Sequence, residues 1–162
     1  MAFLEVRDLA LEYSTEQGPL RAVDGMSFDL AAGEALGIIG ESGSGKTSMA
    51  STLMRLLPRN ATLLGGTMRL DGEDIGALDD EAFRTQVRWS RLAMVFQGAM
   101  HSLNPVVRVG EQVGERLRSD GVSKPDVRAR VEELLGRVGL QAGIADRYPH
   151  ELSGGMKQRV MI

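Results

Sequence analysis

A glycine-rich motif is the most informative part of this sequence. It reads Gly40-Glu41-Ser42-Gly43-Ser44-Gly45-Lys46-Thr47 and matches G-x-x-x-x-G-K-[ST], the pattern of a phosphate-binding loop. The apolar run before it, Glu34–Ile39, predicts a strand buried on both faces of a parallel sheet. Apolar residues after it recur at helical spacing and stop before Pro58; they are Met49, Leu53, Leu56 and Leu57. A strand, a glycine loop and a helix, in this order, is the context that the motif requires.

Each position of the motif has a physical role in binding phosphate. The three glycines, Gly40, Gly43 and Gly45, allow unusual backbone conformations and let N–H groups approach an anion closely. These N–H groups and the positive end of the helix dipole then face the phosphates. Lys46 is expected to reach the β- and γ-phosphates, and the Thr47 hydroxyl to hold Mg²⁺. The sequence therefore predicts a nucleotide site.

Length and composition indicate an ordinary globular protein. The 162 residues are enough for one domain with a sizeable core, and 43% are hydrophobic and 25% charged. A net charge of −3 gives no reason to expect binding to nucleic acid or to an anionic membrane. The absence of cysteine excludes disulfides and thiol catalysis within this span. No apolar run approaches the ~20 residues that cross a bilayer, and we expect no signal peptide at the N-terminus.

The first part of the chain has the pattern of antiparallel strands. Alternating apolar residues predict strands along Leu4–Tyr13 and Met26–Leu30, with a turn at Ser14–Pro19 between them. Arg59–Leu64 is predicted to be a loop, and Thr67–Leu70 a further strand that ends at a tight turn. On a strand, a tyrosine such as Tyr13 is most often a packing residue.

A short helix and a second apolar run follow. Asp79 or Asp80 can cap a helix that buries Phe83 and Val87. The run Leu92–Phe96 predicts another buried parallel strand, and Gln97 follows it directly. In a doubly wound sheet, ligands bind beyond the carboxyl ends of the strands, which places Gln97 near the phosphates. Considered alone, it is an ordinary loop residue.

The spacing of apolar residues then changes to the helical period. One helical face is predicted along Val109, Val113 and Leu117. Ser123 begins the next helix and Gly139 ends it. Its apolar face is expected to comprise Val127, Val131, Leu134, Leu135 and Val138. Its charged residues, Arg128 among them, are interpreted as a solvated face.

A second glycine motif follows this helical region. It reads Leu152-Ser153-Gly154-Gly155-Met156-Lys157-Gln158-Arg159, and Ser153 is a good N-cap. Gly154 and Gly155 expose backbone N–H groups at the start of a helix, where a phosphate can bind. Taken alone, the motif is equally consistent with a simple capped helix.

The order of these motifs resembles that in the ATP-binding subunits of ABC transporters, from Phe3 to Ile162. Gly40–Ser48 is similar to the family's Walker A loop, and LSGGMKQR to its signature motif. Gln97 is similar to the Q-loop glutamine, and Tyr13 to the aromatic residue that stacks on adenine. The segment Gln97–Pro105, QGAMHSLNP, further resembles the branch that imports peptides and nickel, as does Tyr148–Ser153. His101, in this segment, is interpreted as a surface loop residue and not as a catalytic base.

The resemblance implies an α/β fold, a P-loop NTPase of the ABC type. The expected sheet is mixed, with an antiparallel β subdomain, an α-helical insertion and an incomplete core. Residues 1–97 would form the Walker A and β part, 98–150 the helical subdomain, and 151–162 the start of the signature helix. In this family two ATPase subunits face each other head to tail, with ATP between them.

The resemblance also assigns roles to residues, with ATP and Mg²⁺ as cofactors. Lys46 and Gln97 would be catalytic, and Thr47 and Gln97 would contact Mg²⁺. The phosphates would be wrapped by the loop residues Gly40, Glu41, Ser42, Gly43, Ser44, Gly45, Lys46, Thr47 and Ser48. The partner's ATP would be completed by Ser153, Gly154 and Gly155.

The same resemblance implies a set of partners. They are a second ATPase subunit, identical or paralogous, and membrane permease subunits that contact Gln97 and the helical region. An extracytoplasmic solute receptor would act indirectly, and no nucleic acid is expected. The protein would then lie at the cytoplasmic face of the inner membrane, held there by the permease.

The sequence departs from the family after the signature motif. The Walker B Asp, the catalytic Glu and the switch His of the family should lie beyond Ile162. We therefore expect these 162 residues alone to have negligible ATPase activity and unpaired sheet edges, as a fragment of a longer subunit would. Two alternatives remain open: a non-hydrolysing module that dimerises on ATP, and a soluble ABC ATPase of DNA repair or translation. The S-L-N-P segment and the acidic balance weigh against the latter.

Overall fold

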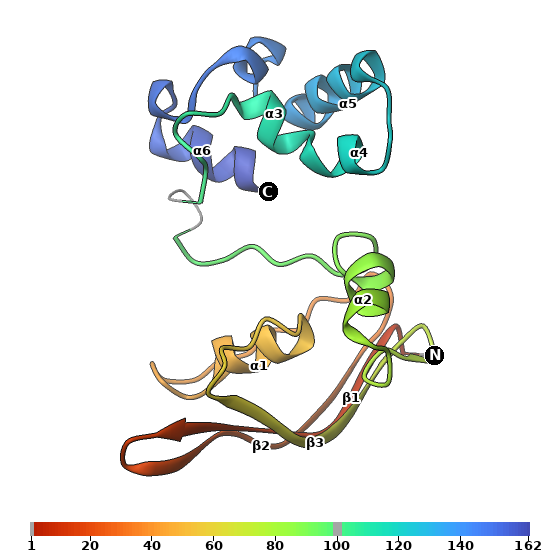
Figure 1. Cartoon of the computed structure of the whole chain (residues 1–162), viewed down its shortest axis with the longest axis vertical. Helices are drawn as coiled ribbons and strands as arrows, with labels where there is room; N and C mark the ends of the chain where they lie inside the picture. The colour runs from red at the N-terminus through yellow and green to blue at the C-terminus, as the bar shows by residue number, and fades with distance from the viewer. Residues whose placement is uncertain (1, 99–101) are drawn as a thin grey trace. The chain divides into compact units, whose positions relative to one another are not determined.

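The computed structural model describes residues 2–98 and 102–162, which form two compact units (Figure 1). The first unit is Met1–Met94 and the second is Val95–Ile162, and each is described by itself. His101 lies outside the described residues, so its interpretation as a loop histidine stays a prediction. The division into 1–97, 98–150 and 151–162 also stays a prediction.

The first unit is built on a four-stranded antiparallel sheet with the strand order β2-β1-β3-β4. A long hairpin joins β1 (Leu4–Thr15) to β2 (Gly18–Leu30), which confirms the two predicted strands. The turn is shorter than predicted, because Ser14 pairs with Pro19 and Thr15 with Gly18. The other strands are β3 (Ala61–Leu70) and β4 (Glu73–Asp74).

The start of β3 differs from the prediction. Most of the segment Arg59–Leu64, predicted to be a loop, is strand, because β1 offers an edge along its whole length. Ala61 pairs with Tyr13 and Thr62 with Glu12. Such backbone pairing satisfies N–H and C=O groups whatever the side-chain pattern, so the local sequence gave no signal for it.

The core of the first unit lies between the sheet and two helical segments, α1 (Lys46–Leu53) and α2 (Asp80–Ala82) with the π-helix η1 (Phe83–Val87) (Figure 1). The predicted cap of α2 is confirmed, because the Asp79 side chain accepts a hydrogen bond from the Ala82 N–H at 2.7 Å. Phe83 and Val87 are fully buried, as predicted. The buried cluster comprises Leu4, Val6, Leu9, Leu11, Val23, Met49, Met68, Leu70, Ile75, Phe83 and Val87.

Helix α1 ends earlier than predicted. Its last residue is Leu53, and Leu56 is 41% exposed instead of continuing the apolar face. Arg55 adopts a left-handed conformation with φ 49°, which reverses the chain. Two hydrogen bonds close the end, from Leu56 N to Ser51 O at 2.8 Å and from Arg55 N to Thr52 O at 3.0 Å. This is the Schellman pattern, in which the chain cannot continue as a helix.

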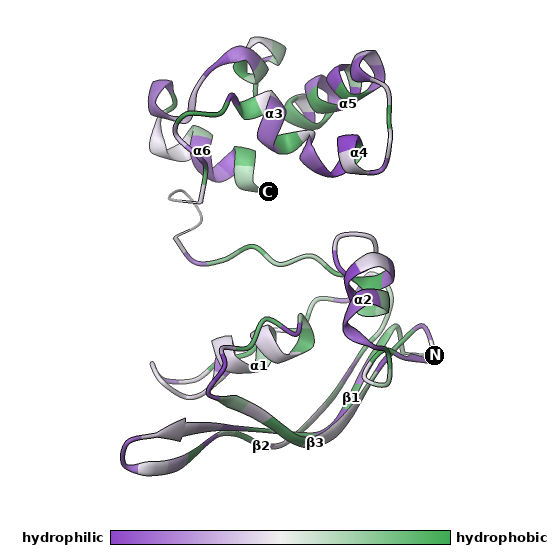
Figure 2. Cartoon of the chain, viewed as in Figure 1, coloured by the Kyte–Doolittle hydropathy of each residue, from purple (hydrophilic) through white to green (hydrophobic). Residues whose placement is uncertain are grey.

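The two predicted parallel strands are not strands within residues 2–98 and 102–162. Glu34–Ile39 is irregular, and Ile39 is 97% exposed. Leu92–Phe96 makes only an isolated bridge between Leu92 and Arg88, and Figure 2 shows its apolar residues along an extended trace. A strand needs neighbours that pair its N–H and C=O groups, and the described sheet offers none to these segments. Both predictions are therefore wrong for this structure.

The second unit is helical, as predicted. Its elements are α3 (Val109–Val113), α4 (Glu115–Ser119), α5 (Lys124–Arg137), the 3-10 turns η3 (Ala142–Asp146) and η4 (Pro149–Glu151), and α6 (Gly154–Met161). The predicted start and stop of α5 are confirmed by the Ser123 cap and by Gly139, which has φ 70°. The face predicted along Val109–Leu117 is broken into two helices at Gly114. The core comprises Val109, Val127, Val131, Leu135, Leu140, Ile144, Ala145 and Leu152. No helix among the described residues is long and apolar enough to cross a membrane.

Candidate functional site

The glycine loop of the first unit leads directly into α1. Gly45 caps the helix with φ 88° and ψ 0°, and its carbonyl accepts a hydrogen bond from Met49 N at 2.8 Å. A Cβ atom at this position would lie 2.1 Å from the carbonyl oxygen of Ala22 on β2. Only glycine therefore allows the loop to pack this closely against the sheet.

The Lys46 side chain folds back into the loop that precedes it. Its ammonium donates hydrogen bonds to the carbonyls of Gly40 at 2.8 Å and Glu41 at 2.6 Å, and to the Ser44 hydroxyl at 3.2 Å. Gly40 packs so closely that a Cβ there would lie 2.6 Å from the Ser44 Oγ. The loop is thus curled around a positive charge, which is the arrangement needed to attract a phosphate.

The start of α1 is open to an anion. No side chain caps the helix, and its first turn contains no acidic residue. The first N–H groups of a helix have no partners within the helix, and together with the helix dipole they favour negative charge. Thr47 is exposed at this end, and its hydroxyl oxygen is a ligand type that Mg²⁺ accepts. The residues present fit a nucleotide phosphate with its metal.

Tyr13 reaches this site from β1. Its phenolic hydroxyl donates a hydrogen bond to the Ser48 Oγ on α1 at 3.1 Å, so the structure brings together the predicted adenine residue and the predicted phosphate loop. The bond joins residues that are far apart in the sequence. No sequence pattern could have identified it.

The other predicted site residues belong to the second unit. The Ser153 hydroxyl caps α6 by accepting a hydrogen bond from Met156 N at 3.3 Å, and Gly154 and Gly155 are exposed at the start of this helix. Arg159 ties α6 to the end of α5 through the Gly139 carbonyl at 3.0 Å. Gln97 is exposed in a turn. The predicted residues are therefore distributed over both units.

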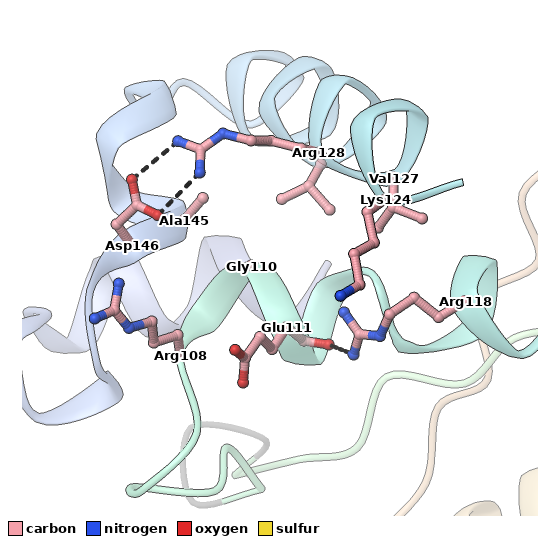
Figure 3. A pocket seen from close by; sticks show the side chains of 10 residues that line it. Arg108, Gly110, Glu111, Arg118, Lys124, Val127, Arg128, Ala145 and Asp146 are labelled. Carbon is pink, nitrogen blue, oxygen red and sulfur yellow. Dashed lines mark hydrogen bonds and ion pairs between the residues drawn. The ribbon is translucent and has the colours of Figure 1, made fainter. Parts of the chain in front are cut away.

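The second unit also contains a pocket that was not predicted from the sequence (Figure 3). It has a volume of about 550 Å³, and its lining includes the apolar side chains of Val127 and Val131. Its charged walls comprise Arg108, Glu111, Arg118, Lys124, Arg128 and Asp146. Arg118 donates to the backbone carbonyl of Glu111, and its side chain lies beside that of Lys124.

One wall of this pocket is an ion pair. Arg128 donates to both carboxylate oxygens of Asp146, at 3.0 and 3.2 Å. These hydrogen bonds and the charge of the guanidinium lower the pKa of Asp146 below its ordinary value. Arg128 was interpreted as part of a solvated face, because helical periodicity does not show that α5 packs against η3 through this pair.

Comparison with known proteins identifies relatives along the whole chain. The sequence profile described as ABC transporter matches residues 23–162. A Brucella abortus (strain 2308) protein described as a peptide import ATP-binding protein is 45% identical over 162 residues, covering 98% of this chain and 48% of that protein. The oligopeptide transport ATP-binding protein OppD of Salmonella typhimurium (strain LT2) is 43% identical, with the same coverage of each chain. The chain spans about half the length of these curated relatives.

A solved structure is similar as well. The ATP-binding cassette MJ0796, as a dimer in a post-hydrolysis state bound to ADP and Pi, superposes with a TM-score of 0.79 at 26% identity. The match covers 98% of this chain and 66% of that chain. This likeness confirms the predicted fold class, although the two predicted parallel strands are irregular here. A profile match over most of the chain, together with relatives more than 40% identical, shows that the protein belongs to the ABC transporter family.

Proposed function

We propose that this chain supplies the ATP-binding part of the ATPase subunit of a peptide importer. The observation that carries the proposal is the loop curled around Lys46 at the uncapped start of α1. Close relatives named for peptide import and oligopeptide transport support the solute class. The peptide and nickel branch resembled by the sequence leaves nickel as the second candidate solute.

In this proposal the residues of the first unit bind and orient the nucleotide. Phosphate oxygens replace the carbonyls of Gly40 and Glu41 as partners of the Lys46 ammonium, and the first N–H groups of α1 bind the same phosphates. Mg²⁺, when bound, neutralises phosphate charge, and Thr47 and Gln97 would hold it. The Tyr13 ring, tied to α1 by its hydroxyl, stacks on the adenine.

A second ATPase subunit completes the site. Ser153, Gly154 and Gly155 present backbone N–H groups at the exposed start of α6, where they would bind the γ-phosphate of ATP held by the partner. The dimeric state of the MJ0796 structure supports this arrangement. ATP would then join the two subunits, and hydrolysis would release them. The partner can be identical or a paralogue.

The helical unit would contact the permease. The pocket of Figure 3 offers Arg118 and Lys124 to an acidic segment of a transmembrane subunit. This contact would hold the protein at the cytoplasmic face of the inner membrane, and the extracytoplasmic receptor would act on it only through the permease. No nucleic acid takes part.

Uptake by intact cells tests the proposed function. In the natural full-length protein, Lys46→Ala should abolish uptake of a labelled oligopeptide, because the phosphates lose their central charge. Arg84→Ala is the control, since Arg84 is exposed and its side chain pairs with Glu81. Peptide uptake at the wild-type rate in the Lys46→Ala cells would contradict the proposal. Loss of nickel uptake alone would reassign the solute.

The 162 residues alone are expected to turn over ATP negligibly. Phosphoryl transfer needs a held metal and an oriented water, and no apolar run ending in Asp-Glu follows the signature motif in this sequence. A phosphate-release assay on the isolated polypeptide checks this. Steady turnover that Lys46→Ala removes is the result that would overturn the expectation.

A further inference from the structure

We infer that Arg55 and Arg88 position the phosphate loop by fixing the far end of α1. The inference rests on the proposed function, because it concerns how α1 presents Lys46 and Thr47 to ATP. Neither arginine lies in the loop itself. Both lie in the first unit, where each is half-buried.

Arg88 caps the C-terminal end of the helix. It follows η1 and donates from Nε to the Met54 carbonyl at 3.0 Å and from a terminal nitrogen to the Arg55 carbonyl at 2.8 Å. The last carbonyls of a helix have no partners within the helix and carry the negative end of its dipole. The guanidinium of Arg88 satisfies the carbonyl of Met54, the C-cap residue, and that of Arg55 just beyond it, and its positive charge favours this end of the dipole.

Arg55 links the same end of the helix to the segment Ile75–Leu78. Its guanidinium donates to the carbonyls of Leu78 at 2.7 Å, Ile75 at 2.8 Å and Gly76 at 2.7 Å. Its backbone has φ 49°, a conformation in which glycine is the usual residue at a helix end. An arginine in this strained position indicates that its side-chain contacts compensate for the strain.

The two arginines converge on one buried ring. The guanidinium carbon of Arg55 lies 4.4 Å from the centroid of the Phe83 ring, and that of Arg88 lies 5.6 Å from it. Phe83 is fully buried, so both cations are held against a rigid part of the core. The end of α1 is thereby attached to the segment from Ile75 to Arg88.

Rigid attachment at one end sets the position of the other. An eight-residue helix is about 12 Å long and moves as a unit, so a loose C-terminal end also loosens the loop at its start. A loop that is less ordered in the free protein must become ordered when ATP binds, and this entropy cost weakens the affinity for ATP. The entropy cost is the same in the ground state and in the transition state. It therefore raises KM for ATP and leaves kcat unchanged.

Steady-state ATPase kinetics of the natural full-length protein test the inference. Arg88→Ala should raise KM for ATP roughly tenfold with kcat unchanged, because the two carbonyls lose their donor. Arg88→Lys keeps one donor and should raise KM less. Arg55→Gly keeps the left-handed helix end but loses the side-chain contacts, and should also raise KM. Arg84→Ala, four residues before Arg88 and paired with Glu81, should change neither constant.

If the two arginines only stabilise the fold, Arg88→Ala lowers the folded fraction, so apparent kcat falls while KM stays at the wild-type value. That result would overturn the inference. If Arg88→Ala does not fold, the same criterion applies to Arg88→Lys and Arg55→Gly. Failure of the proposed function is distinguishable, because the wild-type protein would then show no ATPase activity that Lys46→Ala removes.

Discussion

Gly45 is the residue on which the geometry of the phosphate loop depends most. Its φ of 88° lies in the left-handed region, and the space for a side chain is filled by the Ala22 carbonyl. The motif pattern predicted a glycine here for its close approach to phosphate. The structure adds a second reason, which is the close approach of the loop to β2.

Gly45→Ala should therefore destabilise the protein. We expect the free energy of unfolding to fall by about 1–3 kcal/mol, because strain in the backbone adds to the clash with Ala22. Chemical denaturation of the full-length protein measures this. Gly37→Ala is the matched control, since a Cβ at Gly37 meets nothing within 4 Å and its φ is not positive. Equal stability of both variants would show that the loop does not pack on β2 as described.

Residue types in the loop could be predicted from the sequence, but their partners could not. Lys46 and Thr47 were identified by the pattern alone. The bond between Tyr13 and Ser48, and the contacts of Arg55 and Arg88, join residues that are distant in the sequence. Such contacts depend on tertiary packing, for which a local pattern contains no signal.

At the scale of elements, the sequence predicted correctly those helices and strands that depend mainly on local interactions. The hairpin of β1 and β2 follows from alternation, and α5 follows from its cap and its stop residue. Glu34–Ile39 and Leu92–Phe96 were predicted as strands from apolar runs, but a buried strand also needs partners on both sides. The described sheet provides no partner strand for either segment, so both are apolar but irregular.

The cap of α5 gives a test at this scale. Ser123→Ala should lower the free energy of unfolding by ~1 kcal/mol, because the helix loses the side-chain acceptor for the Asp126 N–H. Thermal unfolding followed by circular dichroism measures it. Ser119→Ala is the control, since that hydroxyl donates to the carbonyl of Glu115 within α4 and caps nothing. Equal free energies of unfolding for the two variants would contradict the prediction, because the Ser123 cap would then contribute little to stability.

At the scale of the whole molecule, the order of motifs carried the family assignment. A phosphate loop, a glutamine, a helical region and a second glycine motif predicted the ABC type, and the profile match and relatives confirmed it. The charged pocket of the second unit was missed, because its walls come from four separate elements. Composition and periodicity describe each element alone and cannot show that they enclose a space.

Equilibrium binding of a fluorescent ATP analogue to the full-length protein is the most direct test that the loop around Lys46 is the nucleotide site. The wild-type protein should bind, and Lys46→Ala should bind at least about tenfold more weakly, a loss of ~1.4 kcal/mol or more. Lys124→Ala, a lysine in the second unit, should bind as tightly as the wild-type protein. If Lys46→Ala binds with wild-type affinity, the loop around Lys46 is not the nucleotide site.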